Sequence, residues 1–340
     1  MKVIDLEAHF YTEDYIKYLR SRKEMPREEV HENGIRLQFA PDVWAPRSFQ
    51  LVEKLLDMGE KRIEEMDEAG VDIQVLSLAV PGCEQFDTSE GAAMARETND
   101  ELAEVIRKYP DRYIGLAALA PQDPEGAAAE LERTVTELGM RGAKLNSHVR
   151  GEYLDDEKYW PVFEMAERLD VPIYLHPTLP SPAILKGFAK YGFPLAGPPW
   201  GFAADTSLHT MRLLYSGVFD RYPRLKLVLG HMGEGLPFWL YRIDFYWLKP
   251  WVAAEIRPKT LQKPSYYINH NFLFTSSGMH FLPAFVCAYM ALGADLLAFG
   301  ADHPFETSKE SIESLGTLPI CDADKEKFYH GNAERLLKIG

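Results

Sequence analysis

The sequence predicts an α/β fold in which eight β/α units close into a parallel (β/α)8 barrel, a TIM barrel, with one domain over residues 1–340. Short apolar runs alternate with longer amphipathic segments along the whole chain. Compact apolar runs are typical of parallel strands that are buried on both faces. Eight such units fit a closed barrel better than an open doubly wound sheet. In addition, no glycine-rich phosphate loop follows any of the runs.

The predicted elements follow one another in regular order. Glycines at 70 and 139 occupy positions typical of helix C-caps, and Pro124 follows Asp123 at a helix start. The eight predicted strands are Lys2–Phe10, Ile73–Ala79, Tyr113–Ala120, Gly142–His148, Pro172–His176, Lys226–His231, Phe272–Ser277 and Leu296–Asp302. The six predicted helices, which carry apolar residues at three- and four-residue spacing, are Val52–Glu68, Glu90–Lys108, Pro124–Leu138, Asp155–Leu169, Thr206–Asp220 and Asp322–Leu337.

Two segments are longer than ordinary barrel loops. Residues 11–50 follow the first strand and residues 177–204 follow the fifth. Long structured loops at the carboxyl ends of barrel strands form the walls of active sites. Variable surface loops are the alternative, but aromatic residues such as Trp44 and Phe202 favour lids that line a substrate pocket.

Composition and charge narrow the class of protein. The formal net charge of −14 disfavours binding to nucleic acid or to anionic membranes. An anionic substrate therefore needs a local positive group, such as a metal ion or an arginine. Three widely spaced cysteines, an opening strand in place of a signal peptide, and no apolar run of about 18 residues predict a cytoplasmic protein without a membrane span.

Ionisable side chains gather at the carboxyl ends of four predicted strands, which converge in a closed barrel. Glu7 and His9 lie two residues apart and therefore share the inward face of the first strand. His176 ends the fifth strand and Asp302 ends the eighth. Two imidazoles and two carboxylates form a site for one divalent ion, zinc or manganese.

Further polar residues border this predicted metal site. His231 ends the sixth strand and is either a fifth ligand or, as we favour, an acid/base group. Glu234 can hold the tautomer of His231, although an acidic residue in a first helical turn is the simpler alternative. Asn146 and His148, on the fourth strand, are interpreted as polar groups of the pocket.

With these residues in place, the chain resembles the aromatic-acid decarboxylases of the amidohydrolase superfamily, the amidohydrolase-related group. This group includes the 5-carboxyvanillate, γ-resorcylate and 2,3-dihydroxybenzoate types. The resemblance extends over nearly the whole chain. Its most specific motifs are Glu-x-His on the first strand, LHP on the fifth, GHMGEGLPFWLYRID on the sixth and GADHPFE on the eighth.

The resemblance implies the same four metal ligands, with His231 and Glu234 as a catalytic pair. Arg47 is implied to bind the substrate carboxylate. Arg242 matches an arginine near the neighbouring subunit's pocket, which implies a homodimer or homotetramer. His303 stands where the carboxyvanillate type carries tyrosine, and it is assigned to the substrate pocket.

The expected activity is non-oxidative decarboxylation of a small hydroxylated aromatic acid, by a metal-dependent carbon–carbon lyase. Protonation of the ring carbon by Asp302 would precede loss of CO2, so that no aryl anion forms. The metal ion and Arg47 would orient the carboxylate. A hydrolase or hydratase that activates water on the same barrel is the alternative, and a barrel that only binds metal or small aromatics is a third reading.

Overall fold

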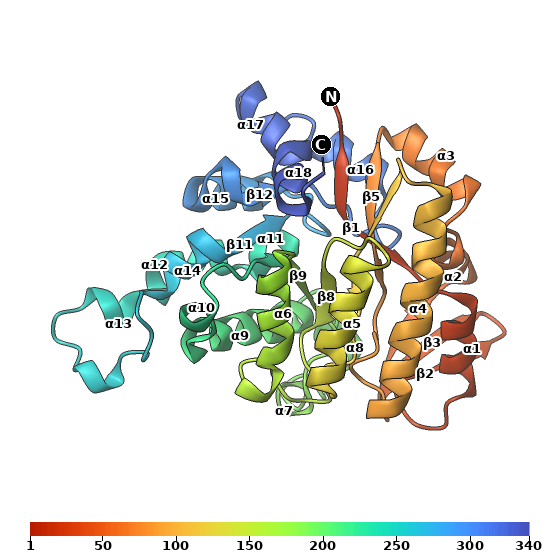
Figure 1. Ribbon diagram of the computed structural model, residues 1–340, viewed down its shortest axis with the longest axis horizontal. Coiled ribbons are helices and arrows are strands. Elements are labelled where there is room, and N and C mark those ends of the chain that lie inside the picture. The colour runs from red at the N-terminus through yellow and green to blue at the C-terminus, as the bar shows by residue number, and fades with distance from the viewer. Residues whose placement is uncertain (340) are drawn as a thin grey trace.

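Eight parallel strands surround the barrel axis in the computed structural model, which describes residues 1–339 (Figure 1). All eight predicted strands are confirmed, and the third is interrupted at Leu116 so that it comprises two short strands. The barrel strands are β1 Ile4–Phe10, β5 Ile73–Leu78, β6 Tyr113–Gly115, β7 Ala117–Ala118, β8 Ala143–Asn146, β9 Ile173–His176, β10 Leu227–Leu229, β11 Phe272–Thr275 and β12 Leu297–Ala298.

The strands form two parallel arcs, β1–β5–β6 and β7–β8–β9–β10–β11–β12, which are joined at both ends. Between β6 and β7, the Leu116 N–H donates to the carbonyl of Leu76 at 2.9 Å. At the opposite seam, the Leu6 N–H donates to the carbonyl of Phe299 at 3.0 Å. These bonds close the ring, so the carboxyl ends of all eight strands open toward one mouth.

Helices cover the outside of the barrel, and every predicted helical segment contains helix. The predicted helix Val52–Glu68 is two helices, because the Asp57 carboxylate accepts the Gly59 N–H at 2.8 Å and competes with the helical bond pattern. The helices are α1 Glu13–Ser21, α2 Phe49–Leu56, α3 Glu60–Ala69, α4 Thr88–Lys108, α5 Pro124–Thr136, α6 Trp160–Leu169, α7 Pro182–Leu185, α8 Phe193–Ala196, α9 Gly201–Ser216, α10 Val218–Arg221, α11 His231–Glu234, α12 Leu236–Ile243, α13 Phe245–Leu248, α14 Pro264–Asn271, α15 Leu282–Leu292, α16 Ser308–Leu315, α17 Asp322–Glu326 and α18 Asn332–Leu337.

Within the residues that the structure describes, nine helices lie outside the predicted segments: α1, α7, α8, α11, α12, α13, α14, α15 and α16. The α15 sequence, LPAFVCAYMAL, is apolar almost throughout and has no polar face that would mark it as amphipathic.

Among residues 1–339, no helix is long and apolar enough to cross a membrane.

The two long loops are folded and pack against each other. Residues 11–50 contain α1 and an antiparallel sheet of three strands, β2 Arg27–His31, β3 Gly34–Ala40 and β4 Val43–Arg47. The ring of Phe39 in this sheet stacks on Phe193 of α8, with centroids 6.5 Å apart. The two segments therefore form one continuous wall.

Candidate metal and catalytic site

The four predicted ligands meet at the mouth of the barrel. One ligand atom from each of Glu7, His9, His176 and Asp302 lies within 4.8 Å of the others. Nε2 of His176 is 3.1 Å from Oε1 of Glu7, and Nε2 of His9 is 3.0 Å from Oδ1 of Asp302. Strands β1 and β9 supply three of these residues, and Asp302 lies in the loop after β12, which ends at Ala298 and not at Asp302 as the sequence predicted.

The unpaired atoms of this cluster point to a metal ion. Oε1 of Glu7, Nε2 of His9 and Nε2 of His176 are buried, and none has a hydrogen-bond partner among residues 1–339. Buried polar atoms are usually paired, so three unpaired ligand atoms that face one another favour a cation between them. Two imidazole nitrogens and two carboxylates suit one divalent cation.

The ligand side chains of His176 and Glu7 also form hydrogen bonds through the atom that does not face the cluster. Nδ1 of His176 bonds the carbonyl of Pro177 at 2.6 Å, which leaves Nε2 free for the ion. The Glu7 atom Oε2 accepts hydrogen bonds from Tyr174 and Ser277. Such outer partners fix the orientation of metal ligands.

His231 and Glu234 lie beside the cluster in a strained turn. Nδ1 of His231 is 2.7 Å from Oε1 of Glu234, and Nε2 of His231 is 3.9 Å from Oδ2 of Asp302. Both His231 and Glu234 have positive φ, 52° and 53°. A Cβ on Gly278 would approach the His231 ring to 3.0 Å, so only glycine allows the neighbouring loop this close.

The charges of the site act strongly on its imidazoles. Burial alone would lower the pKa of His231, but Glu234, Glu7 and Asp302 together raise it to about 10. Burial and the nearby Lys144 cation instead lower the pKa of His176 to about 3. In the metal-free protein His176 is therefore neutral, which is the form that binds a metal ion, whereas His231 can carry a proton.

The polar residues of β8 are engaged within the chain. The Asn146 side chain donates to Glu84 at 3.0 Å and accepts from Lys144 at 3.1 Å. Nε2 of His148 is 2.8 Å from the carbonyl of Leu179, and Nδ1 of His148 accepts from the peptide nitrogen of residue 151. Both residues border the mouth, but their bonds are directed to the loops.

Arg47 is buried beneath the wall formed by the two long loops. Its Nη2 donates to the carbonyl of Val80 at 3.1 Å, and its guanidinium lies 5.2 Å from the Tyr11 ring centroid. Nη1 of Arg47 is 3.7 Å from Glu28 and has no hydrogen-bond partner in the described part of the chain. Nη1 of Arg47 and Oε2 of Glu28 are thus a buried ion pair without a direct hydrogen bond.

The predicted aromatic wall residues differ in exposure. Trp44 is 39% exposed, and the guanidinium of Arg36 lies 4.3 Å from its ring centroid. Phe202 is half-buried at the start of α9 and meets Phe193 edge to face, with centroids 6.1 Å apart.

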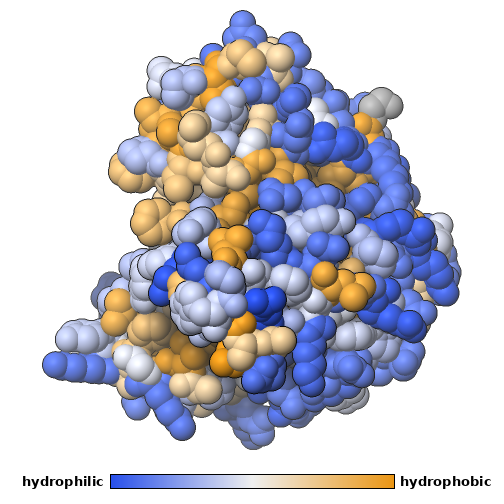
Figure 2. All heavy atoms as spheres, turned by 90° about the vertical axis from the view of Figure 1, so that its left-hand side faces the viewer, coloured by the Kyte–Doolittle hydropathy of each residue, from blue (hydrophilic) through white to orange (hydrophobic). Residues whose placement is uncertain are grey.

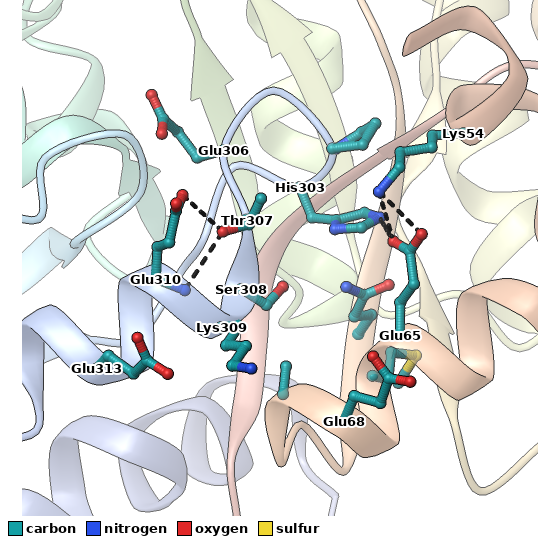
Figure 3. Close-up of a pocket in the computed structure, with 14 residues that line it drawn as sticks. Lys54, Glu65, Glu68, His303, Glu306, Thr307, Ser308, Lys309, Glu310 and Glu313 are labelled. Carbon is teal, nitrogen blue, oxygen red and sulfur yellow. Dashed lines mark hydrogen bonds and ion pairs between the residues drawn. The ribbon is translucent and has the colours of Figure 1, made fainter. Parts of the chain in front are cut away.

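His303 turns away from the ligand atoms. Figure 3 shows its ring in a cavity of about 530 Å³ that residues of α3 and α16 also line. Nε2 of His303 is 3.9 Å from Glu65, and Lys54 pairs with the same carboxylate. The backbone of His303 nevertheless bridges to Ala8 and so helps to close the barrel.

Arg242 lies on a different face, on exposed helix α12. Its guanidinium is 4.4 Å from the ring centroid of Phe245. It lines a groove with residues of α9 and α13, among them Leu208 and Tyr246. The structure does not bring Arg242 to the metal site of its own chain.

Several residues of the site were not predicted from the sequence. Tyr174 and Ser277 hold Glu7, and Glu84 holds Asn146. Alternation could have identified Tyr174, which lies two residues before His176 and shares its inward face. Glu84 follows β5 in an irregular loop, where no periodic signal exists.

Comparison with known proteins agrees with this geometry. A family model described as amidohydrolase matches residues 4–339. The chain belongs to the amidohydrolase family. Among the curated relatives of this amidohydrolase, the γ-resorcylate decarboxylase of Polaromonas sp. is 39% identical over 343 residues, covering 99% of this chain and 98% of that protein.

Solved structures of amidohydrolases also match this chain over nearly its whole length. The 5-carboxyvanillate decarboxylase of Sphingomonas paucimobilis has a TM-score of 0.90 and 34% identity, covering 100% of this chain and 99% of that one. The dihydroxybenzoic acid decarboxylase of Polaromonas sp., with bound manganese and the inhibitor 2-nitroresorcinol, has a TM-score of 0.85 and 36% identity, covering 99% and 97%. The predicted barrel and the predicted resemblance to decarboxylases of this superfamily are confirmed.

Proposed function

We propose that this amidohydrolase is a metal-dependent, non-oxidative decarboxylase of a hydroxylated benzoate, a carboxy-lyase. The observation that carries this proposal is the cluster of unpaired buried atoms on Glu7, His9 and His176 beside Asp302. Relatives of similar length are decarboxylases of 5-carboxyvanillate and of dihydroxybenzoates, one of them with manganese. One manganese ion is the proposed cofactor, held by these four residues.

The bound ion would supply a positive charge that holds the substrate carboxylate and orients the ring. Asp302 then acts as the acid that protonates the ring carbon bearing the carboxylate. Cleavage of the carbon–carbon bond returns the electron pair to the protonated ring, which becomes aromatic again as CO2 leaves. A ring hydroxyl ortho or para to that carbon stabilises the intermediate.

His231 and Arg47 complete the proposed chemistry. The Glu234 carboxylate at 2.7 Å favours the protonated form of His231, whose Nε2 faces Asp302. At 3.9 Å, which is too long for a direct hydrogen bond, His231 would relay a proton to Asp302 through one water molecule. Arg47 is the proposed second anchor of an anionic group, as the family resemblance implies; the anion would compete for its guanidinium with Glu28, which lies 3.7 Å from Nη1.

A panel of aromatic acids tests the proposal. Metal-free protein would be reloaded with Mn²⁺ and incubated with 2,6-dihydroxybenzoate, 2,3-dihydroxybenzoate and 5-carboxyvanillate. We expect metal-dependent release of CO2 and the corresponding phenol from at least one acid. Incorporation of labelled water without CO2 release would instead establish the hydratase or hydrolase alternative.

We also propose that the chain self-associates through the face that carries α12 and α13. Figure 2 shows apolar side chains gathered on this side of the molecule. Phe238, Tyr241 and Trp251 are 72%, 71% and 71% exposed, which is unusual for large aromatic residues on a monomer. Arg242 lies on α12 with Phe238 and Tyr241.

Light scattering should report a dimer or tetramer, and a Phe238→Glu, Trp251→Glu variant should be monomeric.

A further inference from the structure

Lys144 of β8 is a buried cation that the proposed chemistry leaves without a role. It pairs in register with Tyr174 of β9, and residues paired on parallel strands point to the same face. The hydroxyl of Tyr174 donates to Glu7, which places this face inside the barrel. Nζ of Lys144 donates to Oδ1 of Asn146 at 3.1 Å, and Asn146 in turn pairs in register with His176. The Lys144 backbone thus lies one layer below the metal ligands, and its ammonium group extends to Asn146 in the layer of His176.

The surroundings of Lys144 are mainly acidic. Glu84 contacts Asn146 through both carboxylate oxygens, and Glu7 and Asp302 lie in the layer above. Burial lowers the pKa of Lys144 to about 8, and Glu84 and Glu7 oppose the change. Lys144 is only 4% exposed, so water screens its charge weakly.

A buried cation beside a metal site has two opposite effects. It repels the divalent ion, and it attracts any anion that binds to that ion. The negative charges of Glu7 and Asp302 balance a divalent ion. The ammonium of Lys144 therefore adds positive charge on the β8 side of the mouth, which Glu84 offsets in part. The rest of the protein, at a net charge of −14, opposes an approaching anion.

We propose that Lys144 is a positioning residue that weakens metal binding and strengthens binding of an anionic aromatic ligand at the barrel mouth. Only the identity of the anion, an aryl carboxylate, rests on the proposed function. The expected weakening of metal binding depends only on the position of the Lys144 ammonium group near the metal ligands.

Direct binding measurements test this without turnover. Mn²⁺ affinity, followed by the electron paramagnetic resonance signal of free Mn²⁺, would be compared for the wild type, Lys144→Met, Lys144→Arg and Lys17→Met. Lys17→Met removes the same charge from the surface, where the side chain is 68% exposed. We expect Lys144→Met to bind Mn²⁺ about tenfold more tightly, with the two other variants within about twofold of the wild type.

The second measurement is the affinity of the manganese-loaded proteins for 2-hydroxybenzoate, by calorimetry. Lys144→Met should bind it about tenfold more weakly, and Lys144→Arg should restore the wild-type value. Equal or weaker Mn²⁺ binding by a folded Lys144→Met protein, or unchanged affinity for 2-hydroxybenzoate, would overturn the proposal. Lys144→Gln, which keeps a donor for Asn146, replaces Lys144→Met if circular dichroism shows that the latter is unfolded.

An inactive wild type in the substrate panel would contradict the proposed reaction but leave the Mn²⁺ result standing. The two hypotheses therefore fail separately.

Discussion

The two sides of the barrel mouth carry similar polar residues, but the side chains on one side have hydrogen-bond partners within the chain and several atoms on the other side do not. On the side of β1, β9 and β12, buried atoms of Glu7, His9 and His176 have no partner within residues 1–339. On the side of β8, Asn146 and His148 bond to side chains and loop carbonyls at 2.8–3.1 Å. A polar group whose bonds are completed inside the chain stabilises the fold. A cluster of groups with incomplete bonds that face one another marks a place where a ligand can bind.

The largest expected effect concerns Asp302 on the incomplete side. Asp302→Asn keeps an oxygen ligand but removes the proposed proton donor, so kcat should fall by about 10²–10⁴-fold. Turnover of the acid identified by the panel would be measured with Mn²⁺ content and melting temperature as controls. Near-native turnover by a manganese-loaded Asp302→Asn protein would exclude this residue as the acid.

Two histidine variants, one on each side of the barrel mouth, test directly which side binds the metal ion. His176→Asn should abolish the stabilisation by Mn²⁺, which for the wild type is about 2.7 kcal/mol when the ion is at 100 times its Kd. His148→Asn should keep that stabilisation and instead lose about 1–3 kcal/mol with or without the ion, because it leaves loop groups unpaired. Urea unfolding with and without Mn²⁺ measures both. The comparison breaks down if His148→Asn also loses the response to the metal.

The smallest expected effect is the pH dependence of stability due to His209. Like His176, this histidine is buried, but it lies on α9 and accepts the Leu154 N–H at 3.0 Å. Burial lowers the pKa of His209 to about 3. In the unfolded chain this imidazole titrates near its usual value of about 6.5. Stability is therefore unaffected above that pH and is lost as the pH falls from about 6.5 toward 3, because only the unfolded state takes up the proton.

His209→Gln removes this contribution. Between pH 7 and pH 5, the free energy of unfolding of the wild type should fall by about 2 kcal/mol more than that of the variant. Urea unfolding of the metal-free proteins at both pH values gives the difference. Parallel losses in the two proteins would show that His209 is protonated in the folded state.

The ligand set could be predicted from the sequence because it lies on the most regular part of the molecule. Glu7 and His9 alternate on one strand, and His176 and Asp302 follow strands whose apolar runs are unmistakable. Closure of the barrel then brings the ends of these strands together. The antiparallel sheet β2–β4 was not predicted, although the signals are present: Ile35–Phe39 alternates apolar and polar residues, and Asn33-Gly34 is a typical hairpin turn.

The directions of single side chains were also beyond prediction. His303 directly follows Asp302, yet its ring enters the cavity between α3 and α16. Arg242, matched by family resemblance, lies on an exposed aromatic helix far from the ligands along the chain. In both cases the direction of the side chain depends on packing against residues distant in the sequence.

By itself, the sequence determined the eight strands, the end of the barrel at which chemistry takes place and the four residues that can bind a metal ion. Hydrophobic periodicity and the two-residue alternation of strands are local properties, so they can be read without a structure. Only the tertiary structure decided which polar atoms remain unpaired and that Lys144 lies beneath the metal ligands. These features depend on distances between strands, and a distance between strands is set when the barrel closes.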